Sequence, residues 1–169
     1  MKIAYEIHGD INNPVIIVIQ GLGMPLTATP PEIVTRLVNC GYCLLLIDNR
    51  DNGQSEKMNT KIPNIFLQVI RYIFKLRVTS FYSLEDMAND INNLTIKLNI
   101  SNYHVIGVSM GGMIAQLLAI KHTNKVNSLI SIMSTSGDPN LPKPRWKIVK
   151  FILSGTKQKD ISNSSSFYI

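Results

Sequence analysis

Residues 103–115 read YHVIGVSMGGMIA, and the pattern of this stretch changes at its centre. β-branched apolar residues before Gly107 are typical of a buried strand, and a helix-forming run follows Gly112. The residues between them fit G-x-S-x-G, in which a serine is presented on a sharp strand-to-helix turn. Glycines two positions before and after Ser109 let strand and helix pack closely. The stretch therefore predicts that Ser109 is a nucleophile; the alternative, that its glycines serve packing alone, stays open.

Strand-like and helix-like segments alternate on both sides of this stretch. Val15–Ile19, Cys43–Ile47 and residues 126–133 are apolar runs, each expected to be a buried strand of a mostly parallel sheet. Residues 2–8 alternate apolar and polar side chains, which is typical of a half-exposed antiparallel strand. The order of segments predicts right-handed βαβ units, and hence an α/β fold.

Helices are expected between these strands. One has Pro31 in its first turn and ends at Gly41, and another, amphipathic and basic, spans residues 62–78. A third begins after Ser83, which forms a capping-box pattern with Asp86. The helix that follows Ser109 is expected to reach about His122.

Composition limits the class of protein. The chain has 169 residues, 45% of them hydrophobic, enough for one core. It has no apolar run of bilayer length and no signal-peptide pattern, so we expect a cytoplasmic location without stable membrane anchoring. The net charge is +6, but residues 143–160, with six basic side chains and one acidic, carry +5 of it. The charge is thus no argument for a nucleic-acid partner.

The two cysteines, Cys40 and Cys43, form a C-x-x-C pattern. A redox pair needs its first cysteine at a helix N-terminus, whereas Cys40 is expected at a helix C-terminus. Two buried small apolar side chains are the favoured interpretation. Two cysteines are also too few for a metal site, and no cofactor is expected.

Three motifs in order resemble the α/β-hydrolase family, over roughly residues 3 to 145. Residues 15–24 resemble its strand and oxyanion loop, residues 48–55 its D-x-R-x-x-G-x-S turn, and residues 107–112 its G-x-S-M-G-G elbow. Residues 134–142 are similar to the subgroup related to aclacinomycin methylesterase. The resemblance implies a mostly parallel sheet flanked by helices and hydrolysis of carboxylic esters of small molecules.

The resemblance also implies roles for individual residues. Ser109 matches the nucleophile that forms an acyl-enzyme, and the backbone N–H groups of Leu22 and Met110 match the oxyanion donors. Gln20 stands where many members have histidine, a position that shapes the loop. Gly107, Gly111 and Gly112 match structural residues of the elbow, and Asp48 and Arg50 match structural residues of the turn over residues 48–55.

The acid and the histidine of the family's triad find no match. His122 lies about 20 Å along the helix from Ser109, and His8 and His104 lie on strands away from it. Asp138 is expected to begin a turn. We therefore expect a fold truncated after the strand that follows the elbow: a core over residues 1–142, a basic cap-like helix over 143–160 and a disordered tail over 161–169.

Three functional hypotheses remain. The first is an incomplete or split serine hydrolase, nearly inactive alone, whose partners are a small-molecule ester and a second polypeptide if the site is completed in trans. The second is an inactive remnant or a binding module with the same fold. The third, a dinucleotide-binding domain, draws on Gly21, Gly23 and Asp48, but Leu26 stands where a third glycine is required.

Overall fold

The computed structural model describes residues 1–58, 81–138, 140–142, 145 and 147. The chain divides into two compact units, Met1–Ser136 and Gly137–Ile169, and each is described by itself. The helix predicted over residues 62–78 and the predicted tail lie outside the described residues, as does most of the predicted cap helix. Every helix and strand with described bounds belongs to the first unit.

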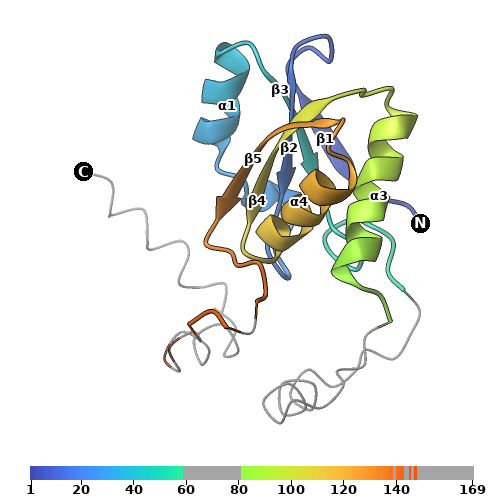
Figure 1. Ribbon diagram of the computed structural model, residues 1–169. Helices are drawn as coiled ribbons and strands as arrows, with labels where there is room; N and C mark the ends of the chain where they lie inside the picture. Colours follow the sequence, from blue (N-terminus) through green and yellow to red (C-terminus); the bar gives the residue numbers. More distant parts are fainter. Residues whose placement is uncertain (59–80, 139, 143–144, 146, 148–169) are drawn as a thin grey trace. The chain divides into compact units, whose positions relative to one another are not determined.

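The first unit is built on a five-stranded sheet with the order β1-β3-β2-β4-β5 (Figure 1). Its strands are β1 (Tyr5–His8), β2 (Val15–Ile19), β3 (Cys43–Ile47), β4 (Tyr103–Val108) and β5 (Val126–Ile132). β1 pairs antiparallel with β3, and the other three pairings are parallel. The predicted α/β fold, with a mostly parallel sheet and an antiparallel first strand, is confirmed.

The two central strands bring the two most informative sequence motifs together. β2 and β4 are neighbours, and Ile19 lies opposite Gly107. Since parallel strands end at the same edge of a sheet, the loop after β2 and the turn after β4 emerge side by side.

Among the described residues, three α-helices and one short 3-10 helix flank the sheet: α1 (Pro31–Asn39), α3 (Leu84–Lys97), α4 (Met110–Lys121) and η1 (Leu26–Ala28). The predicted capping box of α3 is present. The Ser83 hydroxyl accepts the Asp86 N–H at 3.1 Å, and the Asp86 carboxylate accepts the Ser83 N–H at 2.7 Å. The Ser83 N–H and then the Ser83 hydroxyl, which both donate to the Asp86 carboxylate, lower the pKa of that carboxyl. The end of α1 is also as predicted, with Gly41 in a left-handed conformation at φ 85°.

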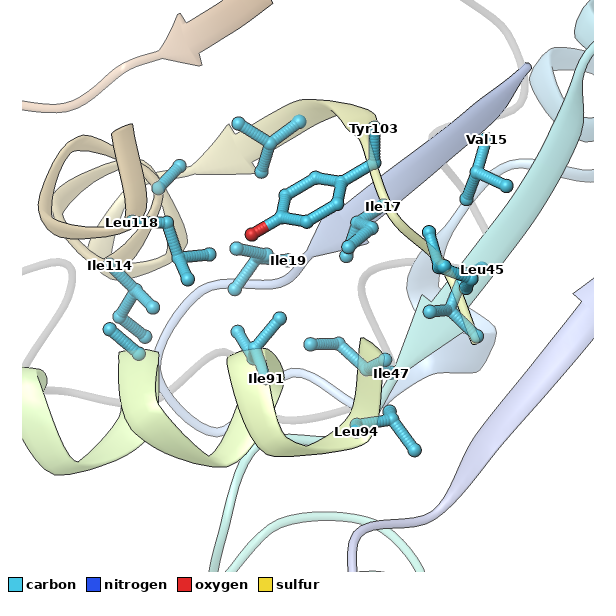
Figure 2. Packing of buried hydrophobic residues seen from close by; sticks show 14 of the residues in the cluster. Val15, Ile17, Ile19, Leu45, Ile47, Ile91, Leu94, Tyr103, Ile114 and Leu118 are labelled. Carbon is cyan, nitrogen blue, oxygen red and sulfur yellow. The ribbon is translucent and has the colours of Figure 1, made fainter. Parts of the chain in front are cut away.

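The helices cover the sheet from both faces, because successive strand residues point in opposite directions. α3 and α4 lie on one face, over a cluster that includes Ile17, Leu45 and Val105 (Figures 1 and 2). α1 lies on the other face, over a smaller cluster that includes Ile16 and Leu44. The β2 and β3 side chains are buried on both faces, which explains their uninterrupted apolar sequence.

Tyr103 is a polar exception within the larger cluster. Its side chain is fully buried, and Figure 2 shows its hydroxyl oxygen among apolar side chains. That oxygen has no hydrogen-bond partner in the described part of the chain. Burial raises the pKa of Tyr103 to about 12, so the side chain stays neutral.

Tyr103→Phe is therefore expected to raise the free energy of unfolding by about 1 kcal/mol, because it removes a buried hydroxyl that lacks a partner. Urea denaturation measures the change. Tyr5→Phe, at a side chain that is 42% exposed, is the control and should change stability by less than about 0.5 kcal/mol. A loss of stability in Tyr103→Phe would show that the Tyr103 hydroxyl has a hydrogen-bond partner in solution.

The prediction that residues 126–133 form a buried strand is wrong in one respect. β5 forms, but it ends at Ile132 and most of its side chains are exposed, with Ile130 at 52% and Ile132 at 40%. β5 lies at the edge of the sheet, and α1 covers β2 and β3 rather than β5. A hollow of about 190 Å³ remains on this face, and its lining includes Leu37, Tyr42 and Ile130.

Both cysteines were predicted to be buried, and this is correct for Cys43 but wrong for Cys40. Cys43 is buried in β3, and burial, followed by the charge of Asp10, raises the pKa of its thiol. Cys40, however, is exposed, because it lies at the C-terminal cap of α1. Both are free thiols.

Candidate active site

Ser109 lies between the last residue of β4 and the first residue of α4. Its φ of 53° and ψ of −118° fall where residues with side chains are rarely found. Two backbone hydrogen bonds hold this conformation: the Ser109 N–H donates to the Ile132 carbonyl, and the Gly112 N–H donates to the Ser109 carbonyl, each at 2.9 Å. The predicted strand, bend and helix over residues 105–120 are confirmed, and the strained residue is the predicted nucleophile.

Three glycines allow this turn to form between a strand and a helix. A Cβ on Gly107 would lie 2.3 Å from the Gly111 carbonyl oxygen, and a Cβ on Gly111 would lie 2.1 Å from that of Ile19. A Cβ on Gly112 would lie 2.5 Å from the Ser134 Cβ. Helix α4 thus packs backbone against backbone on β2 and β4, and no larger residue fits at these positions.

The loop after β2 passes directly beside the serine. A Cβ on Gly21 would lie only 3.4 Å from the Ser109 Cβ, and the Met24 N–H closes a turn onto the Gly21 carbonyl at 3.2 Å. Leu22 is the exposed tip of this turn, and Met110 is the first residue of α4, where N–H groups have no acceptor within the helix. The fold therefore brings both segments with predicted oxyanion donors next to Ser109, at the helix end that favours negative charge.

Two buried amides brace that loop, those of Gln20, whose position the sequence analysis singled out, and of Asn49, which it missed. The Gln20 side chain donates to the Thr29 hydroxyl at 2.7 Å, and the Asn49 side chain donates to the Gln20 carbonyl at 3.0 Å. All three residues are buried. Asn49 occupies an unspecified position of the D-x-R-x-x-G-x-S motif, so no sequence signal marked it.

Asp48 holds the turn after β3 against the same loop. Its carboxylate is buried and accepts the Leu26 N–H at 2.6 Å and the Gln54 N–H at 2.8 Å, while its carbonyl accepts the Ser55 hydroxyl at 2.7 Å. Gly53 leaves space for this carboxylate, since a Cβ there would overlap it. The contacts are those of a residue that organises two loops.

Arg50 joins the same turn to α3. Its Nε donates to the Asp90 carboxylate at 2.7 Å and its Nη2 to the Asp86 carbonyl at 3.1 Å, and its guanidinium stacks 4.9 Å from the centre of the Tyr82 ring. Burial raises the pKa of Tyr82 to about 12, and a hydrogen bond to Asp51 and the negative charge of Asp51 contribute to the rise. These contacts with α3 and with Tyr82 indicate a structural role for Arg50.

None of the three histidines, all within the described residues, bonds to Ser109. His8 lies on the edge strand β1, and the Nδ1 of His104 is 2.7 Å from the Ser128 hydroxyl, between β4 and β5. His122 lies at the far end of α4, where burial, and then the charges of two lysines, lower its pKa. The arrangement brings the serine and the predicted donor segments together but no imidazole.

Asp138 begins a turn in the second unit, as predicted. Its carboxylate accepts the Asn140 N–H at 2.8 Å and its carbonyl accepts the Leu141 N–H at 3.1 Å. The other late acid, Asp160, lies outside the described residues.

Among the described residues, no group of three or more His, Cys, Asp or Glu side chains could hold a metal ion. The glycines after β2 do not open a helix, because η1 intervenes and α1 begins only at Pro31. This is unlike the turn of a dinucleotide-binding motif, whose third glycine leads directly into a helix. In the described part of the chain, no helix combines the length and the apolar character needed to cross a membrane.

Comparison with known proteins agrees with this geometry. The family model described as the alpha/beta hydrolase fold matches residues 14–164. Rhodomycin D methylesterase DauP of Streptomyces sp. (strain C5) is 26% identical over 130 residues, which are 77% of this chain and 38% of that protein.

Two solved structures illustrate the likeness in three dimensions. A marine microorganism esterase has a TM-score of 0.68 at 23% identity, over 90% of this chain and 49% of that one. The enol-lactonase from Burkholderia xenovorans LB400 has a TM-score of 0.58 at 25% identity, over 75% of this chain and 41% of that one. The chain spans less than half the length of each of these three proteins, in agreement with the expectation that it holds only part of the fold.

Proposed function

The chain belongs to the α/β hydrolase fold family, and we propose that it is the nucleophile-bearing part of a serine hydrolase acting on carboxylic esters of small molecules. In the proposed reaction the Ser109 hydroxyl oxygen bonds to the acyl carbon, and the carbonyl oxygen gains a negative charge. The N–H groups of Leu22 and Met110 stabilise that charge. A base takes the Ser109 proton and gives it to the alcohol, which leaves as the carbonyl re-forms, and water then hydrolyses the acyl-enzyme to the carboxylic acid and free serine.

One observation carries this proposal: Ser109, at the junction of β4 and α4, has a φ of 53° and lies where the loop at Gly21 approaches its side chain. A serine that served only as a helix cap would accept a hydrogen bond from the first turn, and this side chain makes no such bond. Strain combined with a freely presented hydroxyl supports a chemical role.

The proposal includes a partner, because the reaction needs a base. Without an imidazole, the Ser109 hydroxyl has the weak nucleophilicity of an ordinary alcohol, and donors and binding alone leave roughly 10³–10⁴-fold acceleration over water. We therefore propose that this chain by itself is nearly inactive and that a second polypeptide supplies the acid and the histidine. The cytoplasmic location stays a prediction from the sequence.

A second candidate is a binding module with the same fold, which binds its ligand without turnover. The placement of all three histidines away from Ser109 favours it.

A fluorophosphonate probe distinguishes the two candidates. We expect slow labelling of the chain that mass spectrometry assigns to Ser109 and that is lost in Ser109→Ala. Ser128→Ala is the matched control, since Ser128 is an exposed serine that bonds to an imidazole but does not lie at a helix N-terminus. Labelling should be unchanged in this control. Folded protein that takes up no label at Ser109 would favour the binding module.

A further inference from the structure

Met24 lies beside the proposed nucleophile. Its sulfur is 3.3 Å, and the Ser109 Cβ is 3.4 Å, from the position that a Cβ on Gly21 would take, so the two side chains flank one glycine. Gly21 has no side chain of its own to fill the space between them. A group bonded to the Ser109 oxygen can therefore reach the Met24 thioether.

The backbone of Met24 is fixed, whereas its side chain is 40% exposed. The Met24 N–H donates to the Gly21 carbonyl at 3.2 Å, and the Asn52 side chain donates to the Met24 carbonyl. These bonds join the loop after β2 to the turn after β3. A methionine side chain is unbranched and polarizable, so it packs against apolar groups of varied shape.

Other apolar side chains adjoin the same serine. Leu22, which follows Gly21, is 74% exposed. Met133 is 82% exposed and follows Ile132, whose carbonyl accepts the Ser109 N–H at 2.9 Å. Single exposed apolar residues are common, but several of them around one strained serine point to a surface that contacts a ligand.

The three segments that meet at Ser109 carry no charged side chain. Residues 15–31, 105–120 and 126–136 contain no Asp, Glu, Lys, Arg or His. The carboxylate of Asp48, which faces the first of these segments, already accepts two backbone N–H groups. An ionised group of a substrate would find no opposite charge on these segments, and removing it from water without a partner costs free energy.

We propose that Met24, with Leu22 and Met133, forms the wall against which the acyl group lies, so that the site takes esters of uncharged, apolar acyl groups. This proposal rests on the proposed function, since it concerns the group that becomes bonded to Ser109. Met24 determines specificity: it contacts the acyl chain and takes no part in bond making. Apolar walls with a few polar groups are the usual form of small-molecule sites, and here the polar groups are the N–H groups of Leu22 and Met110.

Two fluorophosphonate probes that differ only in the group bonded to phosphorus test this wall. One carries a methyl group and the other a butyl chain. Mass spectrometry measures the rate at which each labels Ser109, and each rate is divided by that probe's rate of hydrolysis in water. The butyl probe should label about tenfold faster, as expected when about two methylene groups leave water. A probe with a carboxylate at the end of the same chain should lose this advantage.

Met24→Gln is the decisive variant, because glutamine has nearly the same length but places a polar amide beside Ser109. The ratio of butyl to methyl labelling rates should fall about fivefold. Met24→Leu, which keeps an apolar side chain, should retain the ratio. Ile96→Gln is the matched control: Ile96 is 55% exposed but lies near the C-terminal end of α3, and this variant should leave the ratio unchanged.

The outcomes separate this wall from the proposed function. Equal normalised labelling of Ser109 by both probes would overturn the wall and leave the nucleophile in place. A ratio that Met24→Gln leaves unchanged, or that Ile96→Gln lowers equally, would do the same. No labelling of Ser109 by either probe would overturn the proposed function and the wall together. The comparison of probes on the unsubstituted chain needs no variant, and circular dichroism confirms that each variant is folded.

Discussion

Gly111→Ala is expected to lower the free energy of unfolding by about 3 kcal/mol or more, the largest effect of any single methyl group added to this site. The new Cβ would meet the carbonyl oxygens of Ile19 and Gln20, at 2.1 and 2.7 Å. Both obstacles are backbone atoms, so no side-chain rotation can relieve the overlap. The N-terminus of α4 must move away from β2, and the loop at Gly21 must separate from Ser109.

Urea denaturation measures this loss, and Gly23→Ala is its control. Gly23 lies in the same loop region with φ at 71°, but a Cβ there would meet nothing within 4 Å. Its substitution adds conformational strain alone, about 1 kcal/mol. If Gly111→Ala were as stable as Gly23→Ala, the close approach of helix to strand would not exist in solution. Labelling of Ser109 by the fluorophosphonate should disappear in Gly111→Ala and persist in Gly23→Ala.

Asp48→Asn is expected to lower the free energy of unfolding by about 2 kcal/mol. The carboxylate accepts N–H groups with both oxygens, so the asparagine must turn its own NH₂ group toward one of these donors. One buried N–H group, of Leu26 or Gln54, is then left without an acceptor. The loss should be accompanied by faster hydrogen exchange in residues 20–29 and 48–55, which the carboxylate joins.

Asp10→Asn is the matched control for this substitution. Asp10 is exposed, and its carboxylate accepts the Asn12 N–H within one turn, a role that asparagine performs equally well. Its stability should change by less than about 0.5 kcal/mol. Equal stability of Asp48→Asn and Asp10→Asn would mean that the bonds of Asp48 do not hold the two loops.

The local patterns predicted the elements well, because local chemistry determines them. Val15–Ile19 and Cys43–Ile47 were expected as buried strands and form β2 and β3 with those bounds. The capping box at Ser83 and the left-handed Gly41 are also confirmed, since each depends on residues within a few positions. Burial at the edge of the sheet could not be predicted in this way. β5 has the composition of a central strand, but its exposure depends on which elements lie beside it.

By itself, the sequence determined the family, the strand, turn and helix around Ser109, and the glycines that make this turn possible. These features follow from backbone sterics and hydrophobic periodicity, which act over short distances along the chain. Only the tertiary structure decided that Gly21 lies against Ser109 and that Asn49 and Asp48 brace the loop beside it. The physical reason is that hydrogen bonds and close packing join residues that are 20 to 90 positions apart in sequence, and only the folded sheet brings them together.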